Sequence, residues 1–307
     1  MHSLSEIQSE FAGIANLEFL SKQIVEGFIT GLHRSPFHGF SVEFAEHRLY
    51  NAGESTKNID WKLFARSDKL FVKKFEEETN LRGHIVIDTS SSMLYPFQEK
   101  NLLNKLCFSV FCSAALIHLL RKQRDAVGLS FFSDKVELHT GDRLSTTHAK
   151  LLFSKLEELL KYNEDQLKRP TSAAASLHQI AENVHQRSLV VIFSDMFESH
   201  PQELFSALQH LRYNKHEVIL FNVTDKKREL EFNFQNRPYK FVDMESGAEF
   251  KLNPNEIREF YTKKMQDYLQ EIKLKCMQFQ IDLVHADING PFKDVLQAYL
   301  LKRSQLF

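Results

Sequence analysis

The sequence is poor in cysteine and has no surplus of charge. Its 307 residues include three cysteines, Cys107, Cys112 and Cys276, an odd number, and two of them fall in one apolar, helix-like run. This pattern indicates buried thiols in a reducing compartment and excludes a disulfide framework or a cysteine-based zinc site. The 39 basic and 40 acidic residues leave a net charge of -1. Bulk electrostatic attraction to nucleic acid or to a membrane surface is therefore not expected.

Long hydrophobic runs are also missing. The most apolar stretch, residues 107–120, is shorter than the ~20 residues that a membrane span needs, and it contains His118. It predicts a buried helix instead. The first residues lack both the basic leader and the hydrophobic centre of an export signal. We therefore expect a cytoplasmic protein with no membrane span.

Several motifs of catalysis and nucleotide binding are absent. The chain has no Gly-Lys-Ser/Thr phosphate-binding loop, so any use of ATP would belong to a partner. Its 14 histidines include no His-Glu-x-x-His spacing or similar metal-binding pattern. The basic residues between positions 57 and 74 are followed at once by Glu76, Glu77 and Glu78, which favours a mixed-charge surface over a nucleic-acid interface.

What the sequence does contain is an alternation of apolar strands and helices. Strands are expected at 84–90, 126–134, 135–140, 188–195, 217–224 and 281–286, with a hairpin at 239–251 that turns at Ser246-Gly247. Helices are expected at 97–123, 147–162, 172–186, 201–213, 254–279 and 291–303. Several strands are continuous apolar runs, which is typical of a parallel sheet covered on both faces. The fold class predicted is α/β: a doubly wound, mostly parallel, Rossmann-like sheet with helices on both faces.

The first part of the chain has a different pattern. Apolar residues recur every three or four positions from Leu4 to Phe28, which predicts an amphipathic helix ending near Gly31. A non-periodic segment with short strands follows, and residues 70–76 alternate like an edge strand. We expect residues 1–79 to form an N-terminal helix and irregular segment packed on a main domain of residues 80–307.

Polar residues follow two of the predicted strands and suggest a metal site. Asp88, Ser90 and Ser92 form an Asp-x-Ser-x-Ser loop after the first strand, and Asp195 ends another strand. Mg²⁺ takes oxygen ligands, and in an open α/β sheet ligands bind at the carboxyl ends of the strands, where connections leave in opposite directions. Thr171 would add a third hydroxyl, although Thr171 or Ser172 is equally suited to cap the helix that follows. Asp and Ser are also ordinary turn residues, so the first loop alone is a weak signal.

The five positions together resemble the metal-ion-dependent adhesion site (MIDAS) of von Willebrand factor A-type domains. Asp88, Ser90, Ser92, Thr171 and Asp195 match that site in chain order. The resemblance implies that residues 80–307 form a von Willebrand factor A-like domain. It also implies one divalent cation, Mg²⁺ or Mn²⁺ and possibly Ca²⁺, with an open coordination position that an acidic residue of a partner protein fills. Two carboxylates and three neutral hydroxyls leave such a cation able to attract a carboxylate.

The N-terminal segment resembles the bacterial family called domain of unknown function 58. The resemblance rests on dispersed positions that are listed here in chain order: Gly31-Leu-His-Arg-Ser35, Gly39, Val42-Glu-Phe44, Arg48, Tyr50, Gly53-Glu54, Ile59-Asp-Trp61, Ala65-Arg66 and 76–78. Two departures are visible, Glu54 in place of Asp and Lys57-Asn58 before Ile-Asp-Trp. Many members carry N-terminal membrane helices that are not evident here.

The resemblance implies a non-enzymatic, cation-dependent protein-binding module. Members are commonly encoded beside MoxR-type AAA+ ATPases, so such an ATPase is the partner expected first, in the assembly or maturation of protein complexes. The alternative is a metal-dependent phosphohydrolase or nuclease using the same cation. Against it, Ser90 stands where a second carboxylate would serve catalysis, and no Lys or His occupies a motif-defined position nearby.

Overall fold

The computed structural model describes residues 16–32, 47–49, 64–66, 69–73, 81–96, 103–161, 173–197, 201–244 and 247–306. Contacts divide the chain into two units, one of residues 1–28 with 81–307 and one of residues 29–80. In the second unit, strands β1 (His47–Leu49) and β2 (Phe71–Lys73) pair antiparallel. The expected division of the chain at residue 79/80 stays a prediction.

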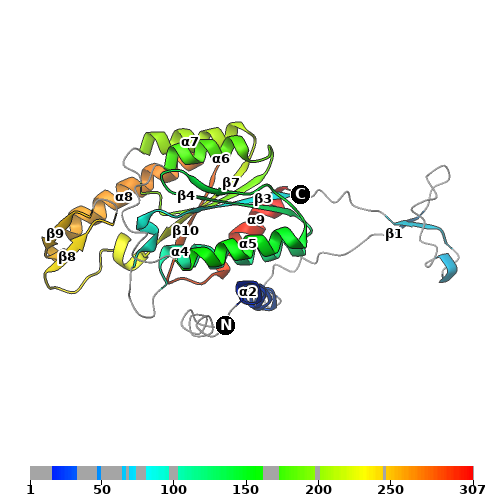
Figure 1. Ribbon diagram of the computed structural model, residues 1–307, viewed down its shortest axis with the longest axis horizontal. Coiled ribbons are helices and arrows are strands. Elements are labelled where there is room, and N and C mark those ends of the chain that lie inside the picture. Colours follow the sequence, from blue (N-terminus) through cyan, green and yellow to red (C-terminus); the bar gives the residue numbers. More distant parts are fainter. Residues whose placement is uncertain are drawn as a thin grey trace. The chain divides into compact units, whose positions relative to one another are not determined.

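A six-stranded sheet forms the centre of the larger unit, in the order β10-β7-β6-β3-β4-β5 (Figure 1). The strands are β3 (Arg82–Asp88), β4 (Ala126–Phe132), β5 (Val136–His139), β6 (Leu189–Ser194), β7 (Glu217–Thr224) and β10 (Asp282–Asp287). Neighbours pair parallel except β4 and β5, which are antiparallel as the predicted hairpin requires. Strands β3, β4 and β6 are almost wholly buried, which explains their continuous apolar runs.

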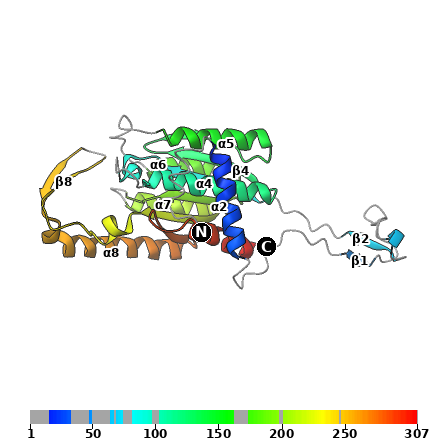
Figure 2. The ribbon, with the colours of Figure 1, turned by 90° about the horizontal axis from the view of Figure 1, so that it is seen from below.

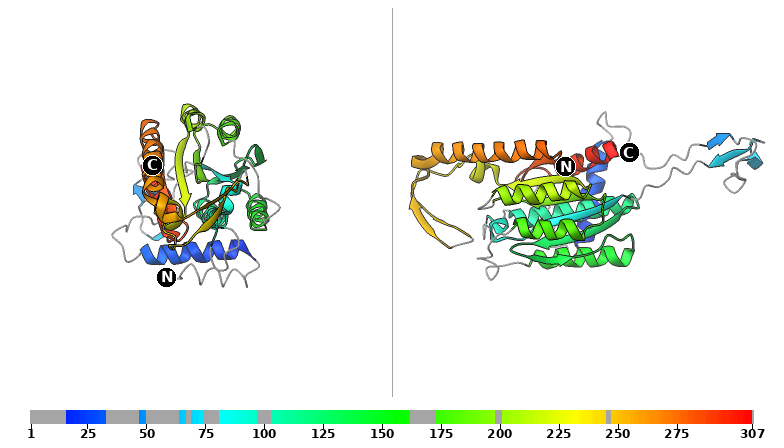
Figure 3. Two further views of the ribbon diagram at one scale, coloured as in Figure 1. Left: turned by 90° about the vertical axis from the view of Figure 1, so that its left-hand side faces the viewer. Right: turned by 90° about the horizontal axis from the view of Figure 1, so that it is seen from above.

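Helices cover both faces of this sheet, as the sequence predicts (Figure 3). Their bounds are α4 (Lys105–Lys122), α5 (Thr146–Leu159), α6 (Ala173–Asn183), α7 (Pro201–Tyr213), α8 (Pro254–Gln278) and α9 (Lys293–Leu306). Helices α6, α7 and the end of α8 share one apolar cluster with the strands, whereas α4 contacts α5 and α9 on the other face. The mostly parallel α/β prediction is therefore confirmed.

Helix α4 begins later than the expected residue 97. The side chain of Asn104 accepts a hydrogen bond from the Cys107 amide at 2.7 Å and caps the helix, so the described helix begins at Lys105. Residues 97–102 lie outside the described part of the chain. As predicted from its apolar sequence, α4 is buried on nearly all sides, including Cys112.

The N-terminal helix α2 (Leu17–Leu32) lies over the face formed by α4 and α5 (Figure 2). Leu17, Leu20 and Val25 are at most 1% exposed, and the Glu157 carboxylate of α5 accepts a hydrogen bond from the Leu17 amide at 3.0 Å. The amphipathic prediction is confirmed from residue 17, and its residues 4–15 lie outside the described part. No described helix is both long and apolar enough to cross a membrane.

Glu217, at the start of β7, joins helices from both faces. Its carboxylate pairs with Lys302 of α9 at 2.7 Å and with Arg212 of α7 at 3.0 Å. Burial raises the pKa of Glu217, but the hydrogen bonds and charges of the two bases outweigh this effect and hold the pKa below its ordinary value.

The connection after β7 begins with a short helix that the sequence pattern did not indicate. A short π-helix, η4 (Lys226–Leu230), precedes a two-stranded hairpin of β8 (Tyr239–Val242) and β9 (Glu249–Leu252). The hairpin agrees with the prediction for 239–251, but Ser246 of its expected turn lies outside the described residues. Figure 2 shows the hairpin standing away from the central sheet at the far end of α8.

Candidate functional site

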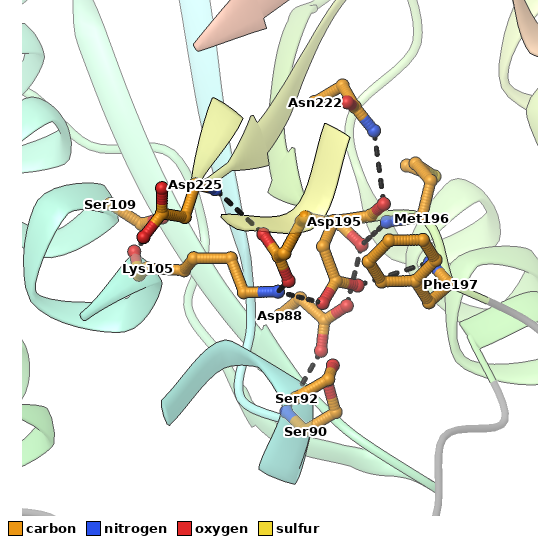
Figure 4. A network of polar contacts seen from close by, with 12 residues as sticks. Asp88, Ser90, Ser92, Lys105, Ser109, Asp195, Met196, Phe197, Asn222 and Asp225 are labelled. Carbon is orange, nitrogen blue, oxygen red and sulfur yellow. Dashed lines mark hydrogen bonds and ion pairs between the residues drawn. The ribbon is translucent and has the colours of Figure 1, made fainter. Parts of the chain in front are cut away.

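The two predicted aspartates meet at the centre of the sheet. Asp88 is the last residue of β3, and Asp195 directly follows β6, the neighbouring strand. Chain connections leave β3 and β6 in opposite directions, so this is the switch point of the sheet, as expected. The hydroxyl of Ser194 donates to Oδ2 of Asp88 at 2.6 Å, and both aspartates are only 1% exposed. Figure 4 shows Asp88 and Asp195 next to each other, with Ser90 and Ser92 close by.

The first loop brings its serines to the same place. The Ser90 amide donates to Oδ1 of Asp88 at 2.9 Å, which closes a tight turn after the strand. Ser90 Oγ and Ser92 Oγ lie 3.1 Å apart, where the short 3-10 helix η2 (Ser91–Leu94) begins. Four of the five predicted ligands, Asp88, Ser90, Ser92 and Asp195, therefore converge. Thr171 lies outside the described residues, so its role as a ligand stays a prediction.

A lysine that the sequence analysis did not single out also enters the site. Lys105, the first residue of α4, is completely buried, and its Nζ lies 2.7 Å from Asp195 Oδ2 and 2.7 Å from Glu229 Oε1. Glu229 reaches the site from η4 and is itself held by the Asp225 amide at 2.7 Å. Phe197 contributes a ring 5.3 Å from the ammonium. A lysine in an otherwise apolar helix is a usable sequence signal, because a buried ammonium needs an anionic partner.

Electrostatics at the site are dominated by burial and by the two aspartates. Burial, followed by the charge of Asp195, raises the pKa of Asp88 well above its ordinary value, although hydrogen bonds from Ser194 and Ser90 oppose the rise. Burial also lowers the pKa of Lys105, but the charges of Asp195 and Glu229 outweigh it and raise the pKa. The single ammonium of Lys105 thus compensates only part of the negative charge of these carboxylates.

The donor atoms at this position fit a hard divalent cation. Only oxygens are offered: two carboxylates and the paired hydroxyls of Ser90 and Ser92. Asp88 accepts from Ser90 and Ser194, one bond to each oxygen, and Asp195 accepts from Phe197 and Lys105 in the same way. A carboxylate oxygen has two lone pairs, so each retains capacity for a cation.

A site of this kind differs from one built mainly from acidic or histidine side chains. Within the described ranges, no cluster of three or more His, Cys, Asp or Glu side chains is arranged to hold a metal ion. The candidate site has two carboxylates for direct ligation and relies on hydroxyls for the rest. It is therefore the serine loop, more than the carboxylates, that makes the cation hypothesis specific.

A second polar chain lies at the opposite end of β3. Asp142 Oδ1 is 2.7 Å from His84 Nδ1, and His84 Nε2 is 2.8 Å from Ser130 Oγ, which is the order of a Ser-His-Asp triad. His84 and Ser130 are 0% exposed, and the Asp142 side chain is 5% exposed. A substrate has no access to these atoms, so these three hydrogen-bonded side chains form a buried structural network.

Comparisons with known proteins give a family and distant structural neighbours. An uncharacterized protein of Mycobacterium tuberculosis and one of Mycobacterium bovis are each 30% identical over 82 residues, which is 27% of this chain and 26% of each relative. The matched segment thus spans about a quarter of the curated relatives' length.

Among solved structures, the conserved hypothetical protein BatB from Bacteroides thetaiotaomicron has a TM-score of 0.43 and 13% identity, covering 73% of this chain and 99% of that one. An aerotolerance-related membrane protein from Bacteroides fragilis has a TM-score of 0.42 and 16% identity, covering 71% and 97%. The PilB minor pilin from Streptococcus sanguinis has a TM-score of 0.42 and 8% identity, covering 78% and 64%.

A family model described as "Protein of unknown function DUF58" matches residues 46–271. This range includes the Asp-x-Ser-x-Ser loop, Lys105 and Asp195, and extends into α8. Since it spans most of the sequence, the chain belongs to the DUF58 family.

Proposed function

We propose that the protein is a divalent-cation-dependent protein-binding module of the DUF58 family. The observation that carries the proposal is the convergence of Asp88 and Asp195 with the Ser90 and Ser92 hydroxyls at the switch point of the sheet. Asp88, Ser90, Ser92 and Asp195, with Thr171 as the fifth proposed ligand, would hold Mg²⁺ or Mn²⁺. When bound, the cation would supply a coordination position for an acidic residue of the partner.

Charge supports a cation at this position. With Asp88 ionised, the carboxylates of Asp88, Asp195 and Glu229 and the ammonium of Lys105 sum to a charge of about -2 in a buried region. A divalent cation would neutralise this sum. A partner's carboxylate would then face a cation that is not surrounded by surplus negative charge.

A MoxR-type AAA+ ATPase is the partner we propose. This chain contains no phosphate-binding Gly-Lys-Ser/Thr loop, so ATP hydrolysis in such a complex would belong to the ATPase. The module would then contribute recognition while its partner contributes the nucleotide-driven work. We propose a binding role and not an enzymatic one for the chain itself.

Calorimetric titration of the purified protein with Mn²⁺ and Mg²⁺ tests the site. Asp88→Asn, and separately Ser90→Ala combined with Ser92→Ala, should abolish cation binding. Asp134→Asn is the matched control, because Asp134 follows the strand β4 next to β3 but is exposed, and its carboxylate accepts a hydrogen bond from the Ser133 hydroxyl. Equal affinity in the wild type and the Asp88→Asn variant would rule out the proposed site.

A further inference from the structure

A groove of about 730 Å³ begins at the candidate site and continues toward the β8–β9 hairpin. One end is formed by Ser92, Lys105 and Glu229, all residues of the polar site described above. Beyond them the lining is mostly aromatic or aliphatic, from the segment after η4, from the hairpin and from α8. The groove therefore joins a charged end to an apolar body.

Ring contacts fix the apolar body of the groove. Phe232 packs against Tyr261 of α8 with 4.4 Å between ring centroids and against Phe241 of β8 at 5.7 Å. Phe234 meets Phe241 edge to face at 5.3 Å. These contacts attach the hairpin to α8. They also stabilise it, since an isolated two-stranded hairpin is only marginally stable in water. The lining is thus a prearranged surface.

Apolar side chains of the hairpin remain open to solvent. Phe241 and Phe250 are cross-strand partners and so lie on the same face of the hairpin. Phe250 is 57% exposed and Val242 is 52% exposed, and both line the groove. Figure 3 shows the hairpin leaving the outer end of α8 sideways, away from the strands of the central sheet. Contiguous exposed apolar surface next to polar residues is typical of a protein-binding site.

The charged end of the groove already accommodates one carboxylate. Glu229 lies there with its Oε1 2.7 Å from Lys105 Nζ, and its side chain is 14% exposed. The guanidinium of Arg228 and the ammonium of Lys264 also line the groove, while Asp243 is the other acidic lining residue. Three cationic side chains, Lys105, Arg228 and Lys264, thus line the groove against two acidic ones, so its lining carries a net positive charge that complements an acidic partner.

We propose that this groove receives a segment of a partner protein in which an acidic residue lies within a few residues of aromatic or aliphatic residues. The acidic side chain enters the end formed by Ser92, Lys105 and Glu229, and the apolar side chains lie against Phe241 and Phe250. The inference rests on the proposed function, since it places the partner's acidic residue at the same site, and it adds the apolar surface that selects the partner.

A phage-displayed library of random dodecapeptides, selected on the full chain in the presence of Mg²⁺, tests the proposal. Selected peptides should carry Asp or Glu within a few residues of Phe, Leu or Met. A synthetic copy of one such peptide should bind about thirtyfold more weakly to the Phe250→Asp variant, because aromatic anchors dominate such interfaces. Phe260→Asp is the matched control, since Phe260 is 69% exposed on α8 and does not line the groove.

Two further measurements separate this proposal from the one it rests on. Cation affinity is measured by calorimetry for every variant, and Phe250→Asp should leave it unchanged; Val242→Asp is a second groove variant should the first disturb the hairpin. The peptide with Asn or Gln in place of its acidic residue should lose binding, as should the wild-type protein in a chelator.

Several results would overturn the groove assignment. One such result is that the protein binds the cation but the selected peptides bind Phe250→Asp and Val242→Asp as tightly as the wild type. This would refute the groove as the peptide site without contradicting the cation site. A dimer in sedimentation that dissociates in Phe250→Asp would show that the groove binds a second copy of this chain. Peptide binding that survives the loss of the acidic residue would refute the charged end. Absence of cation binding in the wild type would instead refute the proposed function.

Discussion

Replacement of Lys105 by Met should destabilise the protein strongly in the absence of divalent cations. The ammonium is buried and lies 2.7 Å from both Asp195 and Glu229, so its removal leaves two carboxylates without their cation. Breaking a buried pair in this way costs about 3–5 kcal/mol. For a domain of this size, each kcal/mol lowers the melting temperature by about 2–4 °C, so we expect a loss of roughly 6–20 °C.

Added Mg²⁺ should reverse part of this loss, because the cation would compensate the same carboxylates. At about a hundredfold excess over its dissociation constant, a ligand that binds only the folded state stabilises it by about 2.7 kcal/mol. Since Lys105 no longer competes for Asp195, the Mg²⁺-dependent rise in melting temperature should be larger in Lys105→Met than in the wild type. Differential scanning calorimetry in chelator and in Mg²⁺ measures both quantities.

Lys122→Met provides the control, because Lys122 ends the same helix but is exposed. The free energy of unfolding of that variant should lie within about 0.5 kcal/mol of the wild-type value. The reasoning fails if the free energy of unfolding of Lys105→Met in chelator also lies within about 1 kcal/mol of the wild-type value. It fails equally, as an account of the cation, if Mg²⁺ shifts both proteins by the same amount.

Three other predictions concern the fold. Gly128→Ala should destabilise the protein by about 1–3 kcal/mol in urea unfolding, because an added Cβ would lie 2.1 Å from the carboxylate of the buried Asp-His pair; Gly141→Ala, with nothing within 4 Å, should be neutral. Asn104→Ala should cost about 1 kcal/mol by removing the α4 cap. Glu217→Gln should lower stability at pH 7, and its difference from the wild type should vanish as the pH falls below the ordinary value of 4.5, since the wild-type pKa is depressed.

The sheet was predictable because its signals are local. The buried strands are continuous apolar runs, and β7 was predicted at its observed bounds, Glu217–Thr224. Asp88 and Asp195 could be paired in advance because each follows an apolar strand and parallel strands end at one edge. Even so, the pairing required β3 and β6 to be neighbours, which the sheet order confirms.

The residues that complete the site depend on contacts that no local pattern reveals. Lys105 and Glu229 are 124 positions apart in the chain, yet their charged atoms lie 2.7 Å apart. Glu229 reaches the lysine from η4, a five-residue π-helix with four charged residues, which has too few positions to show a periodicity. The groove likewise arises from the packing of the hairpin on α8, although each element alone was indicated by its sequence.

The position of helix α2 has a consequence for the order in which the chain is made. Its residues are synthesised before those of α4 and α5, and the Leu17 amide bonds to a side chain 140 positions later. At synthesis rates of about 5–20 residues per second, that partner follows about 7 to 28 seconds afterwards. During this interval the apolar face of Leu17, Leu20 and Val25 lacks the part of its partner surface that α5 supplies, since of the two helices beneath it only α4 is made earlier. The packing of α2 is therefore completed only after α5 has been synthesised.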